Sequence, residues 1–274
     1  MSTTISASQV KELRDATGAP MMDAKRALEE TGGDLDAART LLREKGMAQV
    51  AKRAGRATTE GLVGYRIEDG TGSGQVGTMV AVGCETEPVS KNDAFQAFAK
   101  SVLEAVHADG PGAVEALEQD RVDVGAKLGE NIVVVGAERY ETADGEIVNA
   151  YAHPPANKIG VIVKLAGGTE ELARQLAMHI SFAAPEWLAK EDVPAETVEA
   201  EKQVYLNSDE LQGKPEQAKE KIVEGMLQKR FFAQQPGGVL TEQPWIHDAA
   251  KTVGQALSEA GARVVAFKRL SVAE

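Results

Sequence analysis

The chain has 274 residues, 43% of them hydrophobic but only 4% aromatic, and a formal net charge of −12. This charge argues against binding to duplex DNA or RNA, because such binding relies on cationic side chains that neutralise phosphates. The single cysteine, Cys84, excludes an intramolecular disulfide. With neither an apolar run of about 20 residues nor a secretory leader visible, we expect a cytoplasmic protein.

Residues 1–55 are predicted to form a bundle of three short helices, similar to ubiquitin-associated domains. Ser6 stands at a capping-box spacing before the first helix, and Thr17-Gly18 supplies a stop. A second helix is expected from about Met22 to Glu30. Asp34 is expected to cap a third helix that ends at Gly46.

Two features of this region leave alternatives open. Residues 46–60 are predicted to be a linker, helical in part, and its charge run of Lys52, Arg53 and Arg56 favours a solvated face over an RNA site. One of Met21 and Met22 is expected in the bundle core. The other is left open between the core and an adaptable binding surface.

The rest of the chain contains an internal repeat. Each copy has the order strand–strand–helix–helix–strand, with apolar segments at 61–65, 76–82, 95–106, 124–128 and 132–135, and then at 147–151, 159–163, 172–180, 253–257 and 263–267. Helices on one face of an antiparallel sheet give an α+β sandwich. The stretch Gly70–Gly74 is predicted as a hairpin loop, since it lacks the Lys and the helix of a phosphate-binding loop.

The second copy carries an insertion, residues 188–231. It is rich in charge, and its few apolar residues recur at helical spacing: Ala195, Val198, Ile222, Met226 and Leu227. With prolines near two helix starts, the pattern predicts an antiparallel helical hairpin. The predicted domains are therefore 1–55, a docking bundle; 56–141, the first half of the core; 142–187 with 232–274, the second half; and 188–231, the hairpin.

The sequence does not indicate covalent catalysis. Zinc needs about four clustered ligands, and the candidates stand at no ligand spacing: Cys84, His107, His153, His179 and His247. Cys84 with a distant histidine could form a nucleophile pair, but a buried strand cysteine is the favoured interpretation. We therefore expect neither a metal nor a cofactor.

Several short motifs occur in a fixed order along nearly the whole chain. They are Leu13-Arg14, Thr17-Gly18-Ala19, Met21-Met22-Asp23, Lys25, Ala27-Leu28, Gly33-Asp34, Leu42-Arg43-Glu44-Lys45-Gly46, Lys52, Ala54-Gly55-Arg56, Glu60-Gly61, Cys84-Glu85-Thr86, Val89, Met178-His179-Ile180, Pro185, Gly213-Lys214-Pro215, Lys221-Ile222-Val223-Glu224-Gly225, Gln243-Pro244 and Thr252-Val253. Each motif is weak alone. In this order they resemble the bacterial elongation factor Ts family, the guanine-nucleotide exchange factors of elongation factor Tu.

The resemblance implies a translation factor of protein biosynthesis that binds elongation factor Tu·GDP and promotes exchange of GDP for GTP, without covalent chemistry. It implies partner docking by Leu13, Arg14, Thr17, Gly18, Met21, Met22, Lys25 and His179. It also implies a loop that disturbs the partner's Mg²⁺ and phosphate site, formed by Thr86, Glu87, Pro88 and Val89. No direct contact with DNA or a membrane is expected, and any association with aminoacyl-tRNA or the ribosome would be indirect.

The chain departs from the family pattern in this loop, where the family has Thr-Asp-Phe-Val. Pro88 cannot reproduce an aromatic wedge, and Glu87 keeps the charge on a side chain one methylene longer. We expect the loop to act through its main chain and Glu87. The structural alternative is a plain strand-to-helix connector with Asn92 or Asp93 as the N-cap.

A second departure concerns the end of the sequence. Some family members continue into a further helical module, whereas this chain stops at Ser271-Val272-Ala273-Glu274, so the contacts of that module should be missing.

Two other function classes stay open. A non-exchange, ribosome- or nascent-chain-associated binding module would bind its partner without faster nucleotide release. A cysteine hydrolase built on Cys84 would lose function on alkylation of the thiol.

Overall fold

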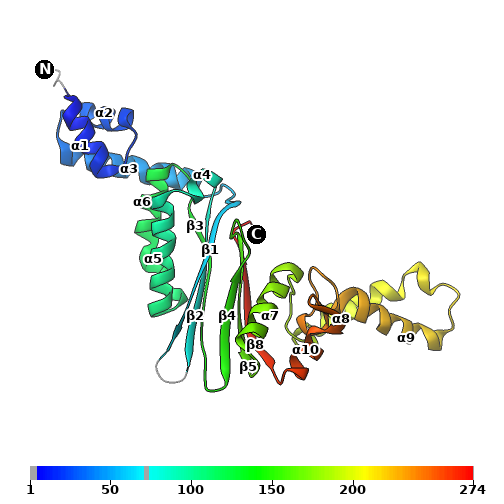
Figure 1. The fold of residues 1–274 in the computed structure, drawn as a ribbon. Helices are drawn as coiled ribbons and strands as arrows, with labels where there is room; N and C mark the ends of the chain where they lie inside the picture. The colour runs from blue at the N-terminus through cyan, green and yellow to red at the C-terminus, as the bar shows by residue number, and fades with distance from the viewer. Residues whose placement is uncertain (1–4, 71–73, 274) are drawn as a thin grey trace. The chain divides into compact units, whose positions relative to one another are not determined.

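The structure, a computed structural model, describes residues 5–70 and 74–273 (Figure 1). The helices are α1 Ala7–Thr17, α2 Met21–Glu30, α3 Leu35–Arg53, α4 Glu87–Ser90, α5 Asp93–Asp109, α6 Glu118–Leu128, α7 Glu170–Ala183, α8 Ala195–Leu206, α9 Glu216–Met226 and α10 Val253–Glu259. The strands are β1 Glu60–Asp69, β2 Gln75–Cys84, β3 Val133–Glu141, β4 Glu146–Ala152, β5 Ile159–Ala166, β6 Pro244–Trp245, β7 Asp248–Thr252 and β8 Arg263–Ser271. Short 3₁₀ or π turns lie at Pro111–Leu117, Lys190–Asp192, Asp209–Leu211, Leu227–Phe232 and Leu240–Glu242. This mixture of helices and sheets confirms the expected α+β class.

Helices α1, α2 and α3 form a bundle whose ends follow the local sequence. Ser6 and Gln9 make the expected capping box, and Gly18 ends α1 in the left-handed conformation with φ of 69°. The Asp34 side chain accepts hydrogen bonds from the first N–H groups of α3. The bundle has its own apolar core: Val10, Leu13, Ala24, Ala27, Leu28 and Ala38.

The expected end of the third helix at Gly46 is wrong, because α3 continues through Gly46 to Arg53. A Cβ at Gly46 would lie 2.7 Å from the Cβ of Ala126 in α6, and Val50, one turn later, is buried. Figure 1 shows α3 running beside α6. A helical glycine costs about 1 kcal/mol relative to alanine, and this close helix packing offsets the cost. Much of the predicted linker is therefore a packed helix.

The first copy of the repeat contains a sheet in the order β1-β2-β3. The apolar face of α5 meets β2 in a core of Val80, Val82, Cys84, Phe95, Phe98, Ala99, Val102, Val106 and Ile132. Asn92 caps α5 through a side-chain bond to Ala94 N, which selects the first of the two predicted caps. Cys84, the last residue of β2, is fully buried as expected.

The second copy contains a sheet in the matching order β4-β5-β8, and so the internal repeat is confirmed. Strands β4 and β5 pair antiparallel, with Glu146 opposite Ala166 and Ala152 opposite Gly160. Helices α7 and α10 cover this sheet with a core that includes Val161, Val163, Leu165, Leu176, Ile180, Val253 and Leu257.

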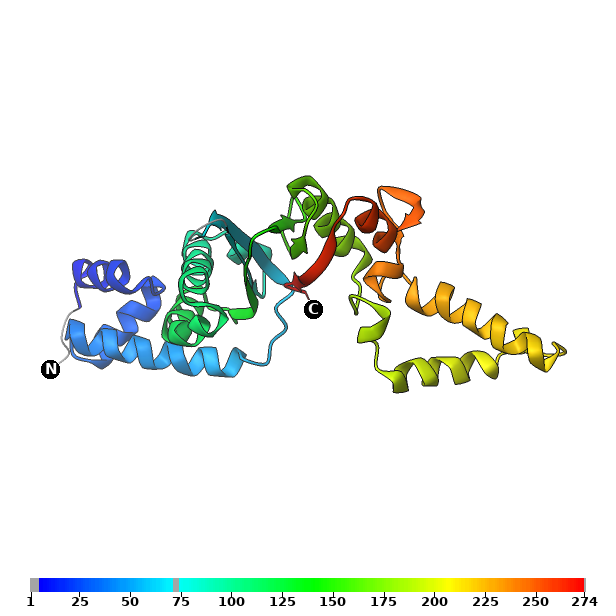
Figure 2. The same ribbon diagram turned by 90° about the horizontal axis from the view of Figure 1, so that it is seen from below.

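The inserted segment contains α8 and α9, which run in opposite directions (Figure 2). Pro194 and Pro215 stand at the N-caps of these helices, as expected. The small core of the hairpin differs from the apolar spacing in the sequence: Val223 is buried and Ala195 is exposed. Leu211, Val223 and Leu227 form the buried cluster of this insertion.

The described residues divide into two compact units. The first contains the described residues up to Gly64, Val80–Ala137 and those from Ser271, and the second contains Tyr65–Met79 and Glu138–Leu270. The predicted domain boundaries stay predictions. Thr71, Gly72 and Ser73 of the predicted hairpin loop, and Glu274 at the C-terminus, lie outside the described residues. Among the described helices, none has the length and apolarity to cross a membrane.

Candidate functional site

The connection between β2 and α5 is a short exposed turn. Thr86 is extended, and the helical turn α4 follows with Glu87, Pro88 and Val89. Pro88 lies in the first turn of α4, where its missing N–H breaks no helical hydrogen bond. Val89 packs against the core of the first sheet, whereas Thr86, Glu87 and Pro88 are exposed. The turn therefore presents a carboxylate and a rigid ring on its outer side.

A buried carboxylate, Glu130, holds the start of this turn. Its Oε2 lies 3.0 Å from the backbone nitrogens of both Glu85 and Thr86, and its Oε1 accepts a hydrogen bond from the Thr86 hydroxyl. Glu130 is only 9% exposed. Hydrogen bonds to an ionised acceptor are among the stronger ones in proteins, so the entry to the turn is fixed.

Sequence reasoning missed Glu130, which lies between α6 and β3 and is 44 positions from Thr86. The available signal was a carboxylate directly after Gly129, the left-handed cap of α6, and directly before Asn131. Such a pattern marks a polar turn, but it does not say which distant backbone the carboxylate binds.

A second carboxylate, Glu85, ties the turn to the end of α3. Arg53 Nη1 lies 3.0 and 3.2 Å from the two carboxylate oxygens of Glu85, and Arg56 Nη1 lies 3.3 Å from Oε2. The Asn131 N–H donates to the same carboxylate at 2.7 Å. Burial alone would raise the pKa of Glu85, but these hydrogen bonds together hold it below the ordinary value of 4.5. The predicted solvated charge run thus includes two arginines in a partly buried ion-pair network.

The exposed part of the bundle contains several of the predicted docking residues. Met21 and Met22, at the start of α2, are 56% and 62% exposed, so the expectation that one of them lies in the core is wrong. Arg14 and Lys25 are also exposed, and Lys25 pairs with Glu29 on its own helix. Flexible thioethers beside cations form an adaptable surface.

The turn between α1 and α2 is rigid next to this surface. The Thr17 hydroxyl donates to Leu13 O at 2.6 Å and accepts from the Ala19 N–H at 3.3 Å. Gly18 is exposed, but a Cβ there would lie 2.7 Å from Cε of Lys127 in α6. Leu13 is fully buried, so its side chain supports the bundle from inside.

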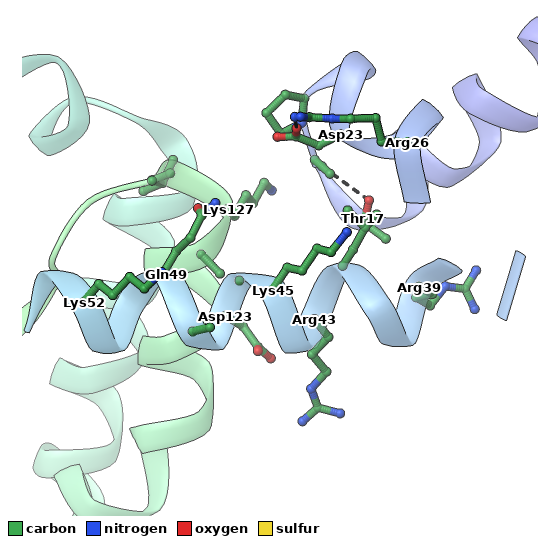
Figure 3. Close-up of a pocket in the computed structure, with 18 of the residues that line it drawn as sticks. Thr17, Asp23, Arg26, Arg39, Arg43, Lys45, Gln49, Lys52, Asp123 and Lys127 are labelled. Atoms are coloured by element: carbon green, nitrogen blue, oxygen red, sulfur yellow. Dashed lines mark hydrogen bonds and ion pairs between the residues drawn. The ribbon is translucent and has the colours of Figure 1, made fainter. Parts of the chain in front are cut away.

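A cavity of about 710 Å³ opens between this turn, α3 and α6. Figure 3 shows Lys45 and Gln49 on the side of α3 that faces the α1–α2 turn. Lys45 pairs with Glu30 of α2 at 2.7 Å, which braces α2 on α3. The cavity is an open, water-accessible groove beside the α3–α6 contact.

His179, the remaining predicted docking residue, lies in α7 of the second unit and is fully buried. Its Nε2 is 2.9 Å from Gln243 Oε1, its Nδ1 accepts from the Ile246 N–H at 3.4 Å, and its ring packs on Trp245. These partners fit a neutral ring that carries its proton on Nε2. Burial, and to a smaller degree the nearby His247 charge, lowers the pKa of His179 to about 4, although the Gln243 hydrogen bond acts to raise it.

The thiol considered as a nucleophile is that of Cys84. Cys84 is buried in the first core, and its Sγ donates to Thr86 O at 3.3 Å. Within residues 5–70 and 74–273, no group of three or more His, Cys, Asp or Glu side chains is placed to hold a metal ion.

Comparison with known proteins gives a consistent result. The family model for elongation factor TS matches residues 85–274. Relatives called elongation factor Ts include one from Idiomarina loihiensis, 41% identical over 98% of this chain and 91% of its own. Another, from Serratia proteamaculans, is 42% identical over 98% of this chain and 92% of its own. One from Escherichia coli O9:H4 is 41% identical with the same coverage.

Proposed function

The chain belongs to the elongation factor Ts family of translation elongation factors, and from this we propose that it binds elongation factor Tu·GDP and exchanges GDP for GTP through the turn Thr86–Val89. The nucleotide and its Mg²⁺ belong to the partner. This protein would supply contacts and no covalent chemistry, cofactor or metal of its own.

The observation that carries the proposal is the construction of the turn. Its first residue is fixed by Glu130, its last packs on the core, and Glu87 and Pro88 between them are exposed. A pre-ordered tip loses little entropy on docking. Glu87 can repel phosphate oxygens, and the Pro88 backbone can occupy space near the metal, although neither replaces an aromatic ring.

The energy required is small. Exchange needs the factor to bind the nucleotide-free partner more tightly than the nucleotide-bound one, and the coupling is reciprocal. A hundred-fold loss of nucleotide affinity corresponds to about 2.7 kcal/mol. Mg²⁺ neutralises the phosphate charge in nucleotide sites, so displacing its ligands would weaken phosphate binding and supply part of this difference.

We assign partner docking to the exposed residues of the bundle: Arg14, Gly18, Met21, Met22 and Lys25. Thr17 and Leu13 would hold this surface in shape. His179, fully buried, would act by fixing the segment around Gln243 and not by touching the partner. A cytoplasmic location, and an indirect association with aminoacyl-tRNA and the ribosome, follow from such a role.

Stopped-flow release of a fluorescent GDP from elongation factor Tu tests the proposal. We expect wild-type protein to accelerate release, and both Pro88→Gly and Glu87→Gln to lower the maximal rate several-fold while the fold is kept. When Mg²⁺ is titrated, the release rates of the wild type and the two variants should become more similar at low Mg²⁺, because less metal then remains to be displaced.

Matched controls are Pro111→Gly, at another exposed proline, and Glu104→Gln, at another exposed carboxylate. Both should release GDP like the wild type. Unchanged release rates for both turn variants would show that the turn is only a connector between β2 and α5. Tight binding with no acceleration at all would favour the non-exchange module, which the exposed Met21 and Met22 also suit.

A further inference from the structure

Helix α3 connects two parts of the molecule that the sequence separates with a linker. Its first residues contribute to the bundle core, through Ala38. Its last residue, Arg53, donates to Glu85, one position before the turn. One uninterrupted helix of 19 residues therefore begins in the docking bundle and ends on the base of the turn.

The second half of α3 is held firmly against α6. Gly46 approaches Ala126 so closely that a Cβ would lie 2.7 Å away, and a Cβ at Gly125 would lie 3.3 Å from Val50. Such close packing at two glycines leaves the two helices little freedom to slide. Figure 3 shows this part of α3 crossing α6 beside the cavity.

The ion pair at the end of α3 is more than a surface contact. The Glu85 side chain is 15% exposed and that of Arg53 is 31% exposed. Each Glu85 oxygen has further donors, Asn131 N–H on one and Arg56 on the other. The Glu85 backbone N–H in turn donates to Glu130. Movement of Arg53 would therefore disturb both carboxylates that fix the turn.

We propose that Arg53 is a positioning residue for exchange, through which seating of the bundle on the partner is transmitted along α3 to the turn Thr86–Val89. The inference rests on the proposed exchange role of the turn. It adds a residue outside the turn and outside the docking surface, and it assigns α3 the task of coupling the two.

Cys84 offers a readout that does not depend on activity. It is the single cysteine of the sequence, it is buried, and its Sγ donates to Thr86 O at 3.3 Å. Labelling of this thiol by an aromatic disulfide reagent under native conditions reports how often the entry to the turn opens.

We expect Arg53→Ala to raise the Cys84 labelling rate about tenfold, as for loss of a charge-assisted hydrogen bond. It should also lower the maximal GDP-release rate several-fold, while the concentration of this protein that gives the half-maximal rate changes less than twofold. Arg53→Lys should recover part of both effects. The matched control is Arg39→Ala, an exposed arginine on the same helix that pairs with Asp36 of its own helix, and it should behave as wild type.

A double-mutant cycle tests the transmission itself. Residues without contact normally contribute additively, so Met21→Ala/Met22→Ala and Arg53→Ala should lower the maximal rate independently if the sites are uncoupled. We expect the methionine change to lose most of its effect on the maximal rate in the Arg53→Ala background. Additive effects would overturn the inference.

The remaining outcomes separate the two proposals. If Arg53→Ala leaves both Cys84 labelling and the maximal rate unchanged, Arg53 has no positioning role. If labelling rises and the maximal rate stays at the wild-type value, the contact positions the turn but the turn does not drive exchange. That result would overturn the proposed function of the turn together with its coupling to the bundle.

Discussion

Glu130 is the residue on which the geometry of the turn depends most directly. Glu130→Ala would leave the N–H groups of Glu85 and Thr86 without their acceptor, which costs about 1–3 kcal/mol for buried groups. We expect a several-fold lower maximal GDP-release rate with a cooperative unfolding transition at lower temperature. Stopped-flow release and thermal melts measure the two effects.

The conservative change Glu130→Gln should behave differently. Its amide oxygen can accept from the same two N–H groups, and its NH₂ can donate to the Thr86 hydroxyl, which also accepts. We expect most of the wild-type rate. A Gln variant as slow as the Ala variant would show that the negative charge, and not the hydrogen bonding, is what matters.

His179 gives the molecule a pH dependence with a definite sign. The pKa of His179 is about 4 in the folded state, and its ordinary value is 6.5. Between pH 4 and pH 6.5 the imidazole is therefore mostly protonated in the unfolded chain and mostly neutral in the folded chain. The stability from this residue is therefore complete above pH 6.5 and is lost as the pH falls towards 4. From pH 7.5 to 5 the loss amounts to about 2 kcal/mol.

Urea unfolding at these two pH values, for wild type and His179→Gln, measures this loss, because the variant lacks the titrating ring. We expect the variant to be less stable at pH 7.5 but to lose about 2 kcal/mol less on acidification. An NMR titration that places the imidazole of His179 near pH 6.5 in the folded protein would contradict the assignment.

At the scale of residues, sequence patterns do not show which distant group a side chain binds. Docking by the motif Met178-His179-Ile180 stays a prediction, and the structure places His179 in a buried hydrogen bond with Gln243, which lies 64 positions further on. Such a pair cannot be read from spacing. One of Met21 and Met22 is expected in the core and the other is left open, but both are exposed at the start of α2.

At the scale of elements, caps and stops were predictable where side chains act locally. Ser6, Gly18, Asp34 and Asn92 each do what their type favours. The predicted end of the third helix at Gly46 is wrong, although a glycine after a helical segment usually ends the helix. Here the glycine serves contact with Ala126, and that requirement comes from α6, about 80 residues later in the chain.

The arm formed by α8 and α9, residues 195–226, should be dispensable. Its buried cluster is small: Leu211 and Val223 lie within the arm and pack with Leu227 just beyond it, so removal of the arm exposes little of the main core. We expect a variant with a short Gly/Ser bridge in place of 195–226 to melt cooperatively within a few degrees of wild type and to release GDP normally. An insoluble product would contradict this.

The deletion should keep the residues at the base of the arm, because they contact the rest of the second unit. Leu188 packs against the core of the second sheet. Phe231 packs against Trp187 with the two rings tilted, and Lys190 Nζ lies 5.3 Å from the centroid of the Phe232 ring. A longer deletion of 188–231 removes these contacts, and we therefore expect it to be the less stable of the two variants.

At the scale of the whole molecule, the repeat was the most predictable feature. The sheets β1-β2-β3 and β4-β5-β8 share one strand order, and the sequence shows it because Val124-Gly125 with Leu128 recurs as Val253-Gly254 with Leu257. Periodicity repeats wherever the fold repeats. Only part of the candidate site was predictable from the sequence: the exposed turn contains a motif, whereas the groups that fix it come from α3 and from the segment between α6 and β3.

The continuity of α3 limits how this part of the chain can vary. An α-helix turns by about 100° and rises by about 1.5 Å with each residue. A single insertion or deletion between Gly46 and Arg53 would rotate the guanidinium to another face of the helix, away from Glu85. The number of residues in this stretch is therefore under constraint as well as their identity, whereas a change of length at the tip of the arm would not alter the position of Arg53.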